Sequence, residues 1–250
     1  MTKKHTEYRR CLPESSHAIL FIHGIVGSPD HFRDFYDRVP ADWSIRSILI
    51  EGHGGTARQF SRSSMARWKE QISQAVDDLA ASHSNILITG HSMGTLLAIE
   101  QAIRAPDRVK GLFLLAVPLK ARMTWAATSQ SIRVALDLNS RNDPVLEAAK
   151  SAYSIHPDRR VWRYLGYVPR YLELLKVMRE TIQEIPRLQV PARVFMSRSD
   201  EIVSPRSAAY LSVNPLIDLD WLEHSDHKYY PEEDKDILLG DFARFCRDEA

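Results

Sequence analysis

Residues 86–105 read ILITGHSMGTLLAIEQAIRA, and this stretch decides the fold. Residues 85–89 form a short apolar run that is typical of a buried strand. A helix is expected over 93–105, where Pro106 stops it. Between the two stands the pentapeptide GHSMG, whose glycines permit a tight turn. The stretch therefore predicts a strand, a sharp turn and a helix in direct succession.

The rest of the chain repeats this alternation of strand and helix. Short apolar or alternating runs predict further strands at residues 17–23, 44–50, 109–117, 192–197 and 217–222. Helical patterns occur at residues 30–39, 65–81 and 236–248. Apolar strands that alternate with helices are typical of parallel sheets buried on both sides. The predicted fold class is therefore α/β, with a mostly parallel central sheet and helices on both faces.

The alternation stops after Pro118, and the next strand begins only at residue 192. The intervening residues are helical in character and include an apolar stripe from Tyr171 to Ile185. We therefore expect a core made of residues 1–118 and 188–250, with an inserted helical cap subdomain at residues 119–187.

The composition argues against several classes of protein. The 250 residues contain 33 Lys and Arg against 32 Asp and Glu, and a net charge of +1 argues against a nucleic-acid binder. Cys11 and Cys246 are too few for a disulfide framework, and the histidines lack the spacing of a metal site. No apolar leader and no run of about 18 apolar residues is present, so a cytoplasmic protein without membrane insertion is expected.

Ser92 is the predicted nucleophile. It occupies the centre of the pattern G-x-S-x-G, which places a serine at a strained turn between strand and helix. Gly90 and Gly94 are small enough to let the turn close without a clash. The helix that begins after the turn offers free N–H groups and the positive end of its dipole. The serine hydroxyl is therefore expected to project from the edge of the sheet.

A serine hydroxyl needs a base to accept its proton, and the base needs an acid to orient it. Chains with this motif carry the three in the order serine, acid, histidine. Asp200, just after the strand at 192–197, is the predicted acid, and His227, after the last strand, is the preferred base. The alternatives that stay open are His224 for the base and Asp226, Asp218 or Asp220 for the acid.

The segment HGIVG, residues 23–27, closes the first predicted strand. A loop at this place can supply one of two backbone N–H groups that bind the oxygen of a tetrahedral intermediate. The backbone N–H groups of Ile25 and Met93 are the predicted oxyanion hole.

Five segments carry a family resemblance: FIHGIVGSPDHF (21–32), EGHGG (51–55), TGHSMG (89–94), SRSDEIVSP (197–205) and HSDH (224–227). Together they resemble the α/β-hydrolase superfamily, and within it the small bacterial carboxylesterases and monoacylglycerol lipases. The resemblance implies a Ser–Asp–His triad, an oxyanion hole and a cap inserted after the sixth strand. Two departures stand out. Asp226 occupies a place where these enzymes often have glycine, and the short N-terminus predicts a trimmed sheet of six or seven strands.

The resemblance also implies an activity. It describes a serine hydrolase of the carboxylesterase or monoacylglycerol lipase type, which cleaves carboxylic esters through an acyl-enzyme and needs no cofactor. We expect the substrate to be a small-molecule ester with an apolar acyl chain, although the resemblance does not carry the substrate over. Because residues 119–187 interrupt the sheet just after the strand at 109–117, part of the stripe from Tyr171 to Ile185 is expected to line the acyl pocket. A thioesterase, an acyltransferase or another reaction on the same triad remains an alternative, as does an inactive binding protein.

Overall fold

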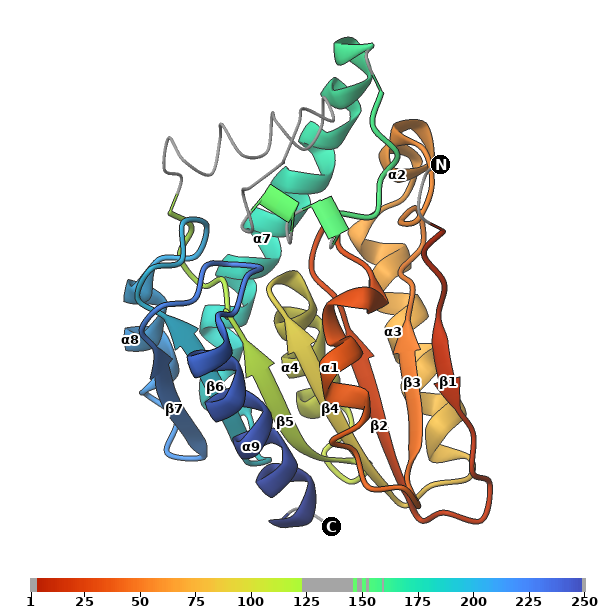
Figure 1. Ribbon diagram of the computed structural model, residues 1–250, viewed down its shortest axis with the longest axis vertical. Helices are drawn as coiled ribbons and strands as arrows, with labels where there is room; N and C mark the ends of the chain where they lie inside the picture. Colours follow the sequence, from red (N-terminus) through yellow and green to blue (C-terminus); the bar gives the residue numbers. More distant parts are fainter. Residues whose placement is uncertain (1–3, 123–145, 148–149, 152, 159, 249–250) are drawn as a thin grey trace.

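The computed structural model describes residues 4–122, 146–147, 150–151, 153–158 and 160–248 (Figure 1). Seven strands form one sheet in the order β1-β3-β2-β4-β5-β6-β7. All neighbouring strands run parallel except β1, which pairs antiparallel with β3. The strands are β1 (Tyr8–Arg10), β2 (His17–Ile22), β3 (Ser44–Ile48), β4 (Asn85–His91), β5 (Val109–Leu115), β6 (Ala192–Ser197) and β7 (Ile217–Leu222). This confirms the predicted α/β class and a sheet of seven strands.

The central strands are buried on both faces, because neighbouring residues of a strand point to opposite sides of the sheet. In β2, Leu20 and Ile22 belong to one hydrophobic cluster, whereas Ile19 and Phe21 belong to another. All four side chains are fully buried. A continuous apolar run, rather than an alternating one, is therefore what this position in the sheet requires.

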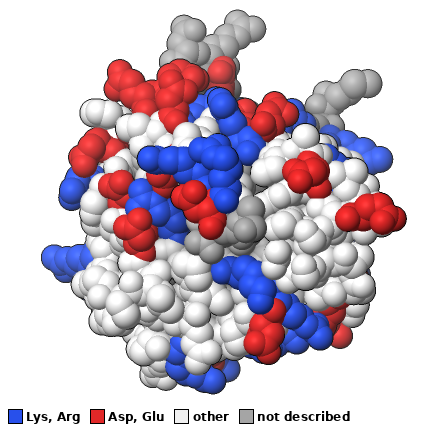
Figure 2. Space-filling view, turned by 90° about the horizontal axis from the view of Figure 1, so that it is seen from below, with Lys and Arg blue, Asp and Glu red and all other residues white. Residues whose placement is uncertain are grey.

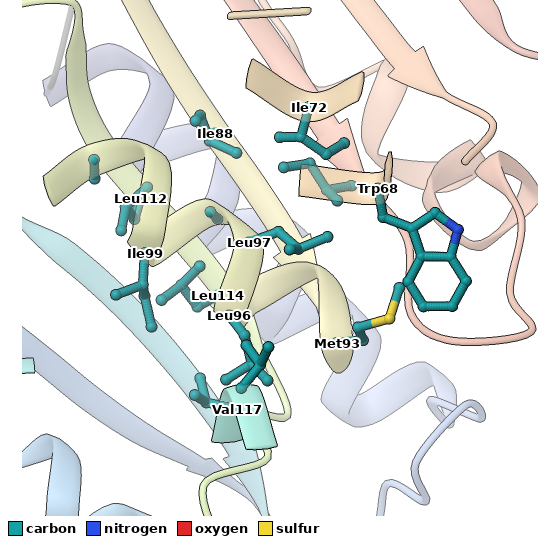
Figure 3. Packing of buried hydrophobic residues seen from close by; sticks show 14 of the residues in the cluster. Trp68, Ile72, Ile88, Met93, Leu96, Leu97, Ile99, Leu112, Leu114 and Val117 are labelled. Atoms are coloured by element: carbon teal, nitrogen blue, oxygen red, sulfur yellow. The ribbon is translucent and has the colours of Figure 1, made fainter. Parts of the chain in front are cut away.

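Helices α3 (Met65–Ala80) and α4 (Met93–Arg104) cover the first face (Figure 1). Figure 3 shows Trp68 and Ile72 of α3 beside Leu97 of α4. Trp68 is fully buried, and its indole N–H donates a hydrogen bond to the carbonyl oxygen of Glu51 at 2.9 Å. The polar atom of this large side chain is therefore satisfied inside the core.

Helices α1 (Arg33–Tyr36) and α9 (Glu232–Asp248) cover the second face with aromatic side chains. The ring centroid of Phe242 in α9 lies 5.0 Å from that of Phe35 and 5.1 Å from that of Phe113. Both pairs meet edge to face, which is a favoured geometry for aromatic rings. The C-terminal helix is thus fixed to the centre of the sheet.

The helices differ from the sequence expectation in several places. The segment expected as one helix over 30–39 is a short 3-10 turn, η1 (Pro29–Phe32), followed by the single turn of α1. The helix α2 (Ala57–Arg62) was not expected, although the residues Thr56 and Gln59 form a reciprocal capping box at its start. The last helix begins at Glu232, four residues before the predicted start.

One long helix is the main element in the described part of the insertion. The sequence from residue 161 forms η2 (Val161–Tyr167), α7 (Val168–Glu184) and η3 (Ile185–Arg187). The buried α7 side chains Leu174, Val177 and Met178 belong to the hydrophobic cluster that α3 and α4 build on the sheet. The helix therefore packs on the core, and the predicted cap, residues 119–187, lies partly outside the described residues.

The remaining described elements after β6 are the short turns η4 (Pro205–Ser207) and α8 (Ala208–Leu211), which precede β7. The lower end of the molecule in Figure 1 is shown in Figure 2, where basic and acidic side chains are interspersed. This mixture agrees with the net charge of +1. The described part of this face therefore offers no large field of one sign.

Candidate active site

Ser92 occupies the turn between β4 and α4 in a strained backbone conformation, with φ 51° and ψ −123°. Its neighbours explain why glycine stands on either side. A Cβ atom on Gly94 would overlap the carbonyl oxygen of Ile22, and one on Gly90 would lie 2.8 Å from the carbonyl oxygen of Gly94. The pattern G-x-S-x-G is thus a steric requirement of the turn.

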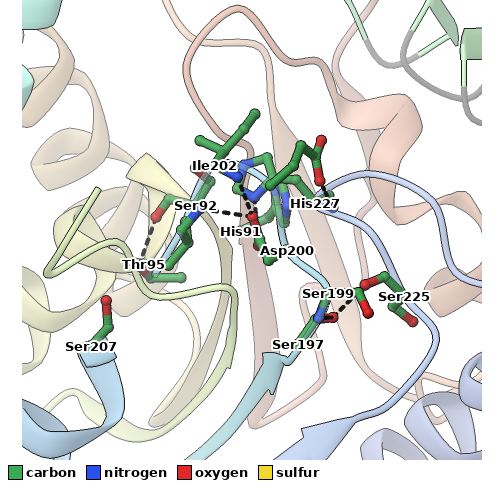
Figure 4. A network of polar contacts seen from close by, with 12 residues as sticks. His91, Ser92, Thr95, Ser197, Ser199, Asp200, Ile202, Ser207, Ser225 and His227 are labelled. Carbon is green, nitrogen blue, oxygen red and sulfur yellow. Dashed lines mark hydrogen bonds and ion pairs between the residues drawn. The ribbon is translucent and has the colours of Figure 1, made fainter. Parts of the chain in front are cut away.

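Three side chains that are far apart in the sequence meet at this turn (Figure 4). The Nε2 atom of His227 lies 3.0 Å from the Oγ atom of Ser92. On the other side of the ring, Nδ1 of His227 lies 2.8 Å from Oδ2 of Asp200. Exposure is 5% for Ser92, 3% for His227 and 1% for Asp200. The structure thus brings together the predicted nucleophile, base and acid in hydrogen-bond contact.

Asp200 is held as a carboxylate by several donors. Its Oδ1 atom accepts hydrogen bonds from the backbone N–H groups of Ile202 at 2.8 Å and Val203 at 2.7 Å. Burial raises the pKa of Asp200, but the charge and hydrogen bond of His227 and these two N–H groups lower the pKa below its ordinary value. An ionised Asp200 beside Nδ1 fixes the ring so that Nε2 faces the serine.

The alternative residues lie elsewhere. His224 is exposed, and its backbone N–H donates to Asp234 at 2.8 Å. Asp218 and Asp220 accept hydrogen bonds from the guanidinium of Arg193 at 2.7 and 3.1 Å, in an ion-pair network between β6, β7 and α9. In this geometry His227, rather than His224, contacts the serine.

Asp226, the residue that departs from the family pattern, is partly buried beside His227. Burial raises its pKa to about 6, and the charges of Glu201 and Asp200 act in the same direction. The position that faces Nδ1 of His227 is held by Asp200. Asp226 therefore neither displaces Asp200 nor prevents His227 from reaching Ser92.

The loop at residues 23–27 passes directly over the serine. A Cβ atom on Gly24 would lie 2.9 Å from the Cβ atom of Ser92, so only glycine fits this close approach. Ile25 lines the same pocket as Ser92, and Val26 adopts a positive φ of 53°. The carbonyl oxygen of Val26 accepts a hydrogen bond at 2.8 Å from the backbone N–H of Ser154, in the insertion.

The second predicted oxyanion donor, the N–H of Met93, lies in the first turn of α4. N–H groups in a first turn have no partner within the helix, which leaves them available to a ligand. Ile25 and Met93 thus lie on the two segments that border Ser92: the loop above it and the helix that follows it.

Four histidines surround this site, and the sequence reasoning assigned them no role; His23, His53 and His91 are buried, and His31 is partly buried. His91 donates a hydrogen bond from Nε2 to the carbonyl oxygen of His227 at 2.9 Å, and its ring centroid lies 3.9 Å from that of His31. Burial lowers the pKa of His31 to about 3 and that of His53 to about 4. Burial also lowers the pKa values of His23 and His91. These four rings are therefore neutral at pH 7.

A small pocket opens beside the serine. Nine described residues line it: His23, Gly24, Ile25, Gly27, His31, His91, Ser92, His227 and Lys228. The list includes none of the α7 residues, so the described structure gives no support to an acyl pocket lined by the stripe from Tyr171 to Ile185.

Among the described residues, no group of three or more His, Cys, Asp or Glu side chains could hold a metal ion.

No described helix has both the length and the hydropathy needed to cross a membrane. Lys228 was not predicted as a member of the site, because nothing in the pattern of residues 224–228 indicates that this lysine lines the same pocket as Ser92.

Comparison with known proteins supports a common origin of this architecture. The family described as serine aminopeptidase, S33, matches residues 13–229. A thermostable monoacylglycerol lipase of Bacillus sp. (strain H-257) is 24% identical over 192 residues, which cover 76% of this chain and 73% of the lipase. A pimeloyl-[acyl-carrier protein] methyl ester esterase of Neisseria meningitidis is 32% identical over 111 residues, covering 43% of this chain and 39% of the esterase.

Solved structures share the fold. The monoacylglycerol lipase of Paleococcus ferrophilus superposes with a TM-score of 0.72 at 15% identity, covering 98% of this chain and 99% of the lipase. A structure from a study of the metagenome-derived lipolytic enzymes LipS and LipT gives a TM-score of 0.75 at 22% identity, with 99% of each chain covered. Because the family match spans most of the sequence, the chain belongs to the serine aminopeptidase S33 family of α/β-hydrolases and is related to bacterial monoacylglycerol lipases and esterases.

Proposed function

We propose that this protein hydrolyses carboxylic esters through a covalent acyl-enzyme on Ser92. The observation that carries the proposal is the pair of contacts from one imidazole, 3.0 Å to the serine hydroxyl and 2.8 Å to a buried carboxylate. This arrangement suits proton transfer, because the base contacts the nucleophile and is itself oriented by an acid.

In the first half of the proposed reaction, Oγ of Ser92 attacks the ester carbonyl while Nε2 of His227 accepts the hydroxyl proton. The negative oxygen of the tetrahedral intermediate binds the backbone N–H groups of Ile25 and Met93. When the intermediate collapses, the bond to the alcohol oxygen breaks and His227 returns its proton to that oxygen. Asp200 stabilises the imidazolium that exists between these two transfers.

In the second half, a water molecule attacks the acyl-serine ester. His227 accepts a proton from the water, and the same two N–H groups bind the second oxyanion. Collapse releases the carboxylic acid and returns the proton to Oγ of Ser92. Every proton and electron pair is accounted for by the chain, the ester and water, so the reaction requires no cofactor.

The proposed substrate is a small-molecule ester with an apolar acyl chain. The relationship to bacterial monoacylglycerol lipases and esterases supports this class. Residues 119–187 would form a cap over the site. Two contacts support that position: Ser154 donates to the loop above Ser92, and Arg122 donates to the carbonyl oxygen of Ile202 at 2.7 Å.

The test is a hydrolysis screen with p-nitrophenyl esters of increasing acyl length, a monoacylglycerol, an acyl thioester and an aminoacyl p-nitroanilide. We expect kcat/KM to be highest for an oxygen ester and to vary with acyl length. The Ser92→Ala variant serves as the control for each substrate. A protein that cleaves only the thioester or the anilide would carry a different reaction on the same residues, and one that cleaves none would contradict the proposal.

A further inference from the structure

We propose that Lys228 is a specificity residue, and that it binds a carboxylate or similar anionic group carried by the substrate close to the ester. The inference rests on the function proposed above and narrows its substrate class. It begins from the position of the lysine, which follows His227 directly and lines the same small pocket as Ser92.

The lining of the pocket is strongly asymmetric in charge. None of the nine described residues that line it carries a carboxylate. Three of its four histidines, His23, His31 and His91, are neutral at pH 7, because burial lowers their pKa values. Among the described residues that line the pocket, the source of positive charge other than His227 is therefore Lys228.

Burial and one neighbouring carboxylate act on the ammonium group of Lys228 in opposite directions. Burial lowers the pKa of Lys228 to about 8, whereas the charge of Glu201 raises it. The Glu201 carboxylate accepts a hydrogen bond from the backbone N–H of His227 at 3.0 Å. On the side of the insertion, Nζ of Lys228 lies 5.9 Å from the ring centroid of Tyr153, a weak cation–π distance.

A charged ammonium that is partly buried is costly unless an anion balances it. A substrate carboxylate that enters this pocket would supply that charge within reach of the serine. It would also find no lining carboxylate to repel it. A neutral ester of the same shape would bring no charge to balance the ammonium, so the pocket favours the anionic ester.

The experiment compares esters that differ only in charge, in two arms that distinguish where the anion is carried. In the acyl arm, p-nitrophenyl hydrogen glutarate is compared with the p-nitrophenyl ester of glutaramic acid, its neutral amide. In the alcohol arm, butyryloxyacetate is compared with butyryloxyacetamide. For each pair the measured quantity is the ratio of kcat/KM for the anionic ester to that for the neutral ester.

We expect this ratio to exceed one in at least one arm for the natural protein. It should fall roughly tenfold to a hundredfold in Lys228→Met, which is the size expected for losing a hydrogen bond to a charged group. Lys228→Arg keeps the positive charge and should retain most of the preference. The matched control is Lys176→Met, which removes an exposed lysine on α7 and should leave the ratio unchanged.

A pH series on the natural protein gives a second readout that needs no variant. The charged group that acts on Lys228 is Glu201, which raises the pKa of the lysine, and Lys228 in turn acts on the rings of His31 and His91, which burial keeps neutral. The pKa of Asp226, the neighbour of His227 on its other side, is about 6, so Asp226 is ionised above pH 7, whereas the pKa of Lys228 is about 8. The ratio should therefore fall between pH 7 and 9.5.

A ratio that stays within twofold in Lys228→Met in both arms, or that is flat across this pH range, would overturn the inference. The failure of the proposed function looks different: the neutral esters would then also resist hydrolysis, and Ser92→Ala would have no effect on them. Loss of turnover with both members of a pair in a folded Lys228→Met variant would likewise count against a role in specificity.

Discussion

The side chain of His53 holds the backbone of Val26: its Nε2 atom accepts a hydrogen bond from the Val26 N–H at 3.1 Å. The other ring nitrogen, Nδ1, donates to the carbonyl oxygen of Ile50 at 3.1 Å. Val26 has a positive φ and follows Ile25, the proposed oxyanion donor. The EGHGG segment therefore supports the loop above Ser92 without contacting the reacting atoms.

The first prediction concerns this support. His53→Leu leaves the Val26 N–H without its acceptor and frees the loop, so kcat should fall by about tenfold or more while KM changes less. The control is His83→Leu, because His83 is equally buried, at 6% exposure, but bonds Ser44 away from the site. Both variants should melt at lower temperature. If they lose kcat equally, His53 contributes only to stability.

The second prediction distinguishes the two histidines after β7. His227→Ala should lower kcat/KM for ester hydrolysis by about 10⁴-fold or more, because base and nucleophile act as one unit. His224→Ala should retain most of the activity, since its side chain is exposed and away from Ser92. Steady-state kinetics on one p-nitrophenyl ester measures both. Equal losses in the two variants would remove the special role of His227.

The third prediction compares two neighbouring carboxylates by the same substitution. Asp200→Asn should lower kcat by roughly 10³- to 10⁴-fold, because the imidazolium loses its partner and the ring its orientation. Asp226→Asn should keep activity within about tenfold, since Asp226 does not hold Nδ1 of His227. If Asp226→Asn loses activity and Asp200→Asn keeps it, Asp226 rather than Asp200 is the acid that orients His227.

Asp200 and Asp226 should also change the stability of the fold in opposite directions as the pH rises. The folded pKa of Asp200 is lowered, so its stabilising contribution is complete above its ordinary pKa near 4 and is lost as pH falls through the folded value. The folded pKa of Asp226 is raised to about 6, so its ionised form destabilises the fold above pH 6. Asp226→Asn should therefore raise the melting temperature at pH 7.5, and the gain should vanish at pH 4.

The fourth prediction uses two glycines that both lie in helices. Gly94→Ala should destabilise the protein by several kcal/mol, since the added methyl group would overlap the backbone of β2 at Ile22. Gly240→Ala, in α9, meets no atom within 4 Å and should stabilise by about 0.5–1 kcal/mol through helix propensity. Denaturant unfolding measures both. A tolerated Gly94→Ala would contradict the close packing beneath Ser92.

Much of the fold could be predicted because its strands are buried on both faces and so appear as apolar runs. The edge strand β7 was instead predicted from its alternating pattern, with its observed bounds, Ile217–Leu222. The strand β1 could not be predicted in this way, because its three residues, YRR, form no apolar run. The strand is defined by its antiparallel pairing with β3. The segment after Pro29 also differs, because its first turn is 3-10 and the following helix is a single turn.

The site could be predicted in part for a similar reason. Ser92, Asp200 and His227 each follow a strand, and parallel strands place their carboxyl ends at one edge of the sheet. The positions of Lys228 and His31 beside Ser92 depend on loop conformations for which the sequence has no periodic signal. From the sequence, the apolar stripe of α7 could either line the acyl pocket or pack against the core. The structure packs Leu174 and Met178 into the core.

The most direct test of the central claim is the labelling of Ser92 by a fluorophosphonate probe, located by peptide mass spectrometry and measured beside ester hydrolysis. The natural protein should carry one probe, on Ser92, and lose its esterase activity in proportion to labelling. Ser92→Ala should fold with a similar melting temperature, take up no probe at the site and lose about 10⁴-fold or more in kcat/KM. Full activity in Ser92→Ala, or complete inactivation with the probe on another residue, would contradict the account.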